Sequence, residues 1–217
     1  MPVAIVGAGG VFPDASGLDA LWANVLAGRS AAGPVPPGRW ALSPEDVVDP
    51  APGASDRVAS GSACLIRELP AGPWPEAFEG LDPLYVLGWE AARQAWQGVR
   101  VAGLDRRRVG LVMGNIVLPD STAADDAVAL LDEAGTLRPA SYRGAGLAAG
   151  LIARVLGFGL GGVALDAACA SSLYAIKLAC AELAAGRADA MVAGGLSRPD
   201  SLYTQMGFSQ LRALSPS

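Results

Sequence analysis

The chain has 217 residues, a formal net charge of −5, 52% hydrophobic residues and no histidine. This acidic balance provides no basic surface for nucleic acid or for an anionic membrane, so we expect neither partner. The three cysteines are an odd number without the paired spacing of a zinc site or a disulfide framework, which favours a reducing, cytoplasmic location. Without histidine, the chain alone lacks the commonest general acid and base.

The first elements alternate between strand and helix patterns. Val3 to Val6 form a short apolar run that ends at glycine, which is typical of a central parallel strand. From Leu18 the apolar residues repeat at helical spacing, which predicts a helix that ends at Gly28. Residues 31–60 are rich in proline and glycine and predict an extended surface excursion. The length allows one large α/β domain or two smaller ones.

The rest of the chain continues the alternation. Asp82 and Pro83 are typical of an N-cap and a first helical position, and predict a helix that reaches Gly98. Further strands are expected at 109–113, 163–167 and 190–194, and further helices at 122–135, at 147–156 and after residue 169. Repeated strand–helix–strand crossings predict a mostly parallel sheet with helices on its faces. One apolar stripe predicts the buried face of the helix after residue 169: Leu173, Ile176, Cys180, Leu183 and Ala184.

Two motifs resemble binding sites, but a structural interpretation is stronger for both. The segment VGAGGVFP resembles a dinucleotide-binding loop, but Phe12 stands where the third glycine is needed, so we expect a turn. The arginines at 106–108 could bind an acidic partner, but the stronger interpretation is that they lie in a solvated loop before a strand.

Cys169 is the strongest candidate for chemistry. It lies in DAACASSLYAIKLAC, residues 166–180, between an expected strand and the first turn of a helix. The backbone N–H groups and the dipole of a helix N-terminus favour the thiolate, which is the reactive form, and they can face a developing oxyanion. The carboxyl ends of parallel strands are also where open α/β sheets bind ligands. Cys64 and Cys180, in contrast, resemble small apolar core residues.

The segment DAACASSLYAIKLACAELAAGRADAMVAGG closely resembles the nucleophile segment of the β-ketoacyl synthases of fatty-acid and polyketide synthesis. The likeness includes residues 2–40, LDPLYVLGWEAARQAW and MGFSQLRALSPS, and so covers nearly all of the chain. GNIVLPD is most similar to iterative polyketide and polyunsaturated-fatty-acid-type synthases. Residues 1–217 as a whole resemble the N-terminal region of a type I ketosynthase domain.

The resemblance implies an α/β, thiolase-like fold, of which the chain would form the N-terminal half of the α-β-α-β-α layers, and normally a homodimer. It implies that the phosphopantetheine arm of an acyl carrier protein hands an acyl group to Cys169, before decarboxylative Claisen condensation with a malonyl-type extender. No cofactor would be bound by the chain itself. The Cys169 N–H would be one oxyanion-hole donor, and Ile116 and Phe208 match residues that line the acyl pocket.

The chain also departs from the family pattern. Family members carry two catalytic histidines, a lysine and a second oxyanion donor in a later half, whereas these 217 residues contain no histidine. Because decarboxylation needs those donors, we expect the chain alone to be inactive in condensation unless a C-terminal ketosynthase half, in the same or a second chain, supplies them. We also expect an exposed apolar face that this half would cover.

Two other functions compete with a catalytic ketosynthase region. One is a non-catalytic scaffold or chain-length-controlling partner of a ketosynthase, but such partners usually replace the cysteine that is retained here. The other is a cysteine-dependent hydrolase, which needs a histidine partner that the sequence lacks.

Overall fold

The computed structural model describes residues 2–51, 54–100, 103–116, 145–198 and 201–215. These residues form two compact units, one within 1–28, 68–117 and 140–197, and the other within 29–67, 118–139 and 198–217. The helix expected at 122–135 lies outside the described residues.

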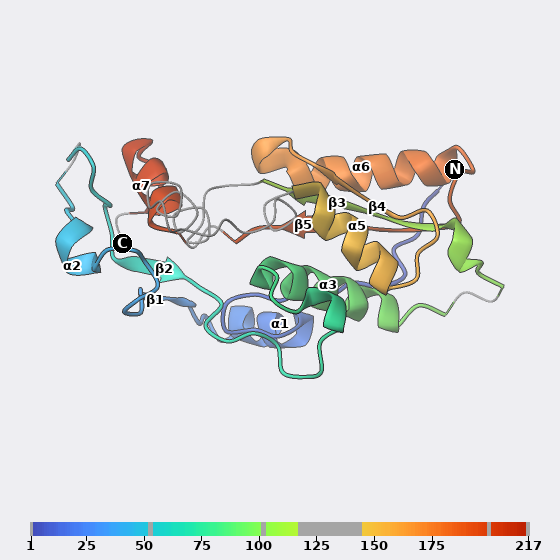
Figure 1. Ribbon diagram of the computed structural model, residues 1–217, viewed down its shortest axis with the longest axis horizontal. Coiled ribbons are helices and arrows are strands. Elements are labelled where there is room, and N and C mark those ends of the chain that lie inside the picture. The colour runs from blue at the N-terminus through green and yellow to red at the C-terminus, as the bar shows by residue number, and fades with distance from the viewer. Residues whose placement is uncertain (1, 52–53, 101–102, 117–144, 199–200, 216–217) are drawn as a thin grey trace, which may run out of the picture. The chain divides into compact units, whose positions relative to one another are not determined.

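The first unit is built on a three-stranded parallel sheet, as the alternating pattern predicts. Strand β3 (Val109–Asn115) lies between β4 (Gly162–Leu165) and β5 (Ala190–Leu196), and all seven residues of β3 are buried. Helix α6 (Ser171–Ala184) runs along one face of the sheet, and α5 (Ala145–Val155) and α3 (Pro83–Gln97) lie on the other (Figure 1). Coverage of both faces explains why β3 is a continuous apolar run.

The long helix α3 follows from its local signals. The Asp82 carboxylate accepts a hydrogen bond from the Leu84 N–H at 2.7 Å, Pro83 takes the first helical position, and Gly98 follows the last residue. Its Tyr85 and Val86 pack with β3 and α5 in the core of the unit. The predicted N-cap and end of this helix are confirmed.

The strand expected at Val3 to Val6 is wrong. No strand lies among the described residues before 32, and Ile5 is 92% exposed. The glycines that follow this segment lie against α3, where the backbones of Gly7 and Gly9 approach the carbonyl groups of Ala95 and Ala91. A short apolar run becomes a strand only if a neighbouring strand pairs with it, and the sequence pattern does not reveal that pairing.

Helix α1 (Leu18–Leu26) follows, and it ends as expected because Gly28 adopts a φ of 60°. None of its residues is buried, and its larger apolar side chains are exposed: Leu18, Trp22, Val25 and Leu26. The helix was thus predicted correctly, while its apolar stripe has no partner within the described part of the first unit.

The predicted buried face of α6 is also wrong in part. Leu173 and Ile176 are 68% and 48% exposed, whereas Ser171, Ala175 and Ala179 form the buried face. Small residues at a spacing of four let the helix lie close to the sheet, and the larger side chains then point away from it.

The described residues of the second unit form only short elements, in agreement with the expected excursion over residues 31–60. Strands β1 (Ala32–Pro34) and β2 (Ser62–Cys64) pair antiparallel, and helices α2 (Pro44–Val47) and α7 (Leu202–Gln210) accompany them. Its own core comprises Val35, Trp40, Val47, Val58 and Leu65. Across the described ranges of both units, none of the helices is long and apolar enough to pass through a membrane.

Candidate active site

Cys169 lies on the turn that joins β4 to α6. The chain leaves β4 at Leu165, passes through the 3₁₀ helix η4 (Ala168–Ala170) and enters α6 at Ser171. The thiol is exposed. The turn therefore presents Cys169 to solvent at the carboxyl end of a parallel strand and at the start of a 14-residue helix, as the sequence predicts.

Three hydrogen bonds define the backbone around Cys169. The Asp166 Oδ1 atom accepts from the Ala168 N–H at 2.8 Å. The Ser171 Oγ atom accepts from the Ala167 N–H at 2.9 Å and donates to the Ala168 carbonyl at 2.7 Å. Ala168 itself has a φ of 50°, in the left-handed region, where a residue with a Cβ carries strain of about 1–3 kcal/mol.

Glycines at the strand ends let α6 approach the sheet. A Cβ placed on Gly114 would lie 2.6 Å from the Cβ of Ser171 and 2.8 Å from the backbone nitrogen of Ser172. A Cβ on Gly195 would lie 3.1 Å from the Cβ of Ser172. The first turn of α6 thus packs directly against the backbone of β3 and β5, and this contact determines its distance from the sheet.

This arrangement suits a nucleophile. The first N–H groups of a helix have no partner within the helix, and with the dipole they attract negative charge on a nearby thiolate or oxyanion. The chain contains no histidine that could act as a base beside the thiol. Within the described ranges, no group of three or more histidine, cysteine, aspartate or glutamate side chains is placed to hold a metal ion.

The other candidate residues take separate positions. Ile116 directly follows β3 and is 36% exposed, and because Gly114 pairs with Leu165, it emerges at the same carboxyl edge as the Cys169 turn. Phe208 lies on α7 in the second unit and is 41% exposed. Cys64 is exposed and Cys180 is half-buried, so the expectation that both are core residues is wrong for Cys64.

Sequence reasoning missed Asp166, Ser171 and Gly114 as builders of the turn. The only sign of these roles in the sequence was that small and polar residues surround a cysteine at the start of a helix. Hydrogen bonds between residues two to four positions apart, and the contact between Gly114 and the helix, do not leave a periodic pattern in the sequence.

The arginines at 106–108 are engaged within the first unit. Arg107 pairs with Asp105 at 2.8 Å, and its hydrogen bond lowers the pKa of that carboxyl group. Arg108 pairs with Asp189 at 2.9 Å, and Arg106 donates to the Leu156 carbonyl at 3.0 Å. These contacts join the start of β3 to neighbouring elements, and they support the structural interpretation over an acidic docking site.

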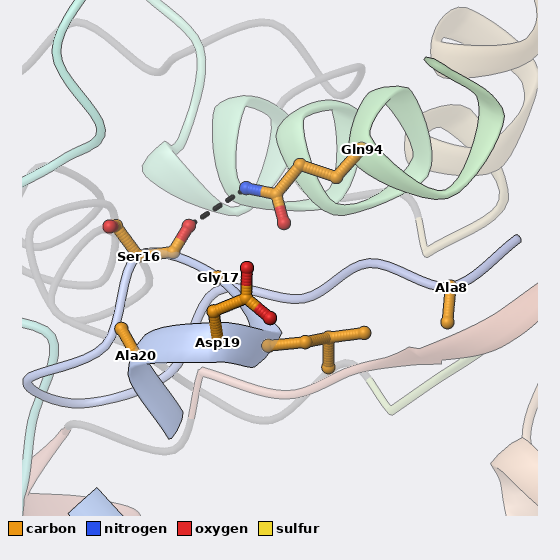
Figure 2. A pocket seen from close by; sticks show the side chains of 7 residues that line it. Ala8, Ser16, Gly17, Asp19, Ala20 and Gln94 are labelled. Atoms are coloured by element: carbon orange, nitrogen blue, oxygen red, sulfur yellow. Dashed lines mark hydrogen bonds between the residues drawn. The ribbon is translucent and has the colours of Figure 1, made fainter. Parts of the chain in front are cut away.

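The glycine-rich N-terminal segment also has a structural explanation. The Gln94 amide donates to the Ser16 carbonyl at 2.8 Å, and its oxygen accepts from the Gly10 N–H at 3.1 Å. Figure 2 shows Gln94 above a hollow of about 420 Å³ that residues 16–20 and Ala8 also line. Cys169 does not line this hollow, and a Cβ on Gly9 would lie 2.4 Å from the Ala91 oxygen. The glycines therefore serve close packing on α3.

Comparison with known proteins gives one consistent family. The family model described as "Beta-ketoacyl synthase, N-terminal domain" matches residues 1–217. One of the phenolphthiocerol/phthiocerol polyketide synthase subunits of Mycobacterium tuberculosis is 33% identical over 232 aligned positions, which cover 99% of this chain and 12% of the relative. The mycocerosic acid synthase-like polyketide synthase of Mycolicibacterium smegmatis is 34% identical over 210 positions, covering 90% and 9%. The chain thus spans a small part of these relatives.

Solved structures agree on the fold. The oxazolomycin ketosynthase domain OzmH KS7 of Streptomyces albus superposes with a TM-score of 0.76 at 22% identity, covering 98% of this chain and 37% of that one. The PfaC ketosynthase–chain length factor gives a TM-score of 0.79 at 24% identity, covering 97% and 26%. These likenesses show an α/β fold of the thiolase-like type.

Proposed function

The chain belongs to the β-ketoacyl synthase family as an N-terminal domain, and we propose that Cys169 is the thiol that accepts the acyl group. Members of this family are acyl-condensing transferases, and the relatives are polyketide synthases. The observation that carries the proposal is the exposed Cys169 thiol on a hydrogen-bonded strand-to-helix turn, at the N-terminus of a 14-residue helix.

The proposed first step is a thioester exchange. The Cys169 thiolate attacks the carbonyl carbon of an acyl group carried on the phosphopantetheine arm of an acyl carrier protein. The new carbon–sulfur bond forms a tetrahedral oxyanion, which the Cys169 N–H at the helix start stabilises. The bond to the phosphopantetheine sulfur then breaks, and that thiolate takes up the proton that Cys169 released. Ile116 and Phe208 are proposed to contact the acyl chain.

The condensation step needs groups beyond this chain. A malonyl-type extender must lose carbon dioxide while donors stabilise its enolate, and the 217 residues contain no histidine for that role. We assign it to a C-terminal ketosynthase half, in the same or a second polypeptide, within a homodimeric cytoplasmic enzyme. In support, the chain covers only 37% of a solved ketosynthase chain.

The experiment is acylation from a small thioester. The 217-residue chain is incubated with an acyl-N-acetylcysteamine, which mimics the end of the phosphopantetheine arm, and adducts are mapped by mass spectrometry. We expect one acyl group on Cys169, its loss in Cys169→Ala and its retention in the matched control Cys180→Ala. No adduct, or equal adducts on all three cysteines, would refute acyl transfer and favour the non-catalytic, chain-length-controlling role.

A further inference from the structure

We propose that Ser171 is a positioning residue for Cys169. The inference rests on the proposed acyl-accepting function of Cys169, and it concerns how the chain keeps that thiol at the helix start. Ser171 does not touch the acyl group in this proposal. Its hydroxyl acts on the two residues that precede the cysteine and thereby fixes the direction in which the thiol points.

The Ser171 hydroxyl joins both sides of the turn. It accepts from the Ala167 N–H at 2.9 Å and donates to the Ala168 carbonyl at 2.7 Å, so it holds the two peptide groups that flank this pair of residues, one before Ala167 and one after Ala168. Since Ala168 has a φ of 50°, this backbone would relax toward a commoner conformation if it were released. Relaxation at Ala168 would rotate Cys169 away from the helix axis.

The environment of Ser171 supports this role. Its side chain is buried at 7% exposure, and the absence of a Cβ on Gly114 gives it room, because such a Cβ would lie 2.6 Å from the Ser171 Cβ. Ser171 therefore packs against β3, and this packing prevents it from moving together with Ala167 and Ala168. Ser172, the next residue, is exposed and takes no part in these hydrogen bonds, which makes it a matched control.

The test is the rate at which iodoacetamide alkylates each cysteine, measured by mass spectrometry. In Ser171→Ala we expect Cys169 to react roughly tenfold more slowly, since two hydrogen bonds of the turn are lost. In Ser172→Ala the Cys169 rate should match wild type. The half-buried Cys180 reports general unfolding in the same sample.

A second variant separates positioning from folding. Glycine adopts a positive φ without strain, so Ala168→Gly removes the need for the Ser171 hydroxyl. The Ser171→Ala effect on Cys169 should therefore be several-fold smaller in the Ala168→Gly background. The proposal is overturned if Ser171→Ala leaves the Cys169 alkylation rate unchanged. It is also overturned if Cys169 slows while Cys180 speeds up and Ala168→Gly restores neither.

The same samples keep this proposal distinct from the proposed function. If the acyl thioester leaves wild-type Cys169 unmodified, the acyl-accepting function fails, while the alkylation comparison still decides the role of Ser171. If wild type and Ser171→Ala are acylated and alkylated at equal rates, the positioning role fails and the acyl-accepting function stands.

Discussion

Replacing Gly114 by alanine tests whether the close contact between β3 and α6 builds the reactive turn. The added Cβ would lie 2.6 Å from the Ser171 Cβ, whereas carbon atoms in contact are about 3.5–4.0 Å apart. The start of α6 must therefore move by about 1 Å. Overpacking of this kind destabilises a protein by about 1–3 kcal/mol, and each kcal/mol lowers the melting temperature of a chain of this size by about 2–4 °C.

The assay combines thermal unfolding with the acylation rate of Cys169. A misplacement of about 1 Å at a reactive group lowers the rate by up to about 100-fold, so Gly114→Ala should lose most acylation even at temperatures where it is folded. Gly194→Ala is the control, because no atom lies within 4 Å of its added Cβ. The reasoning is refuted if Gly114→Ala melts and reacts as Gly194→Ala does.

Three further predictions concern the first unit. Gln94→Ala removes the two bonds that tie the N-terminal segment to α3, so hydrogen exchange should quicken in that segment and not in the sheet. The hydrogen bond from Arg93 lowers the pKa of Glu90. The stability that this pair contributes is therefore present at neutral pH and is lost as the pH falls through that lowered pKa. The difference in unfolding free energy between wild type and Glu90→Gln, measured by urea titration, should shrink in acid. Leu173→Ser should change the unfolding free energy by less than about 0.5 kcal/mol, because the side chain is exposed, whereas Ala175→Leu should lower it by about 1–3 kcal/mol; equal effects of the two would contradict the orientation of α6.

Local signals in the sequence were enough to predict most of the first unit. Strand β3 is a continuous apolar run, Asp82 caps α3, and Gly28 ends α1, and each of these depends on residues close together in the chain. The strand expected at Val3 to Val6 failed, although its pattern resembles that of β3. Pairing between strands joins residues far apart in sequence, and an apolar run alone carries no information about its partner.

The candidate site shows the same division. The position of Cys169 at the end of a strand and the start of a helix follows from local patterns, and the structure agrees. The left-handed Ala168 and the bonds of Ser171 do not follow from those patterns, because alanine gives no sign of a positive φ. The structure adds the backbone geometry of the turn, on which the proposed positioning of Cys169 by Ser171 rests.

The packing that builds the turn also determines what lies beside it. Because Gly114 draws α6 close to the sheet, only small side chains fit beneath the helix, and Leu173, Tyr174 and Ile176 point away from it and are exposed. In the proposed function, a C-terminal ketosynthase half would cover exposed apolar surface of this chain and would bring the donors for condensation, so one association would both bury apolar surface and complete the site.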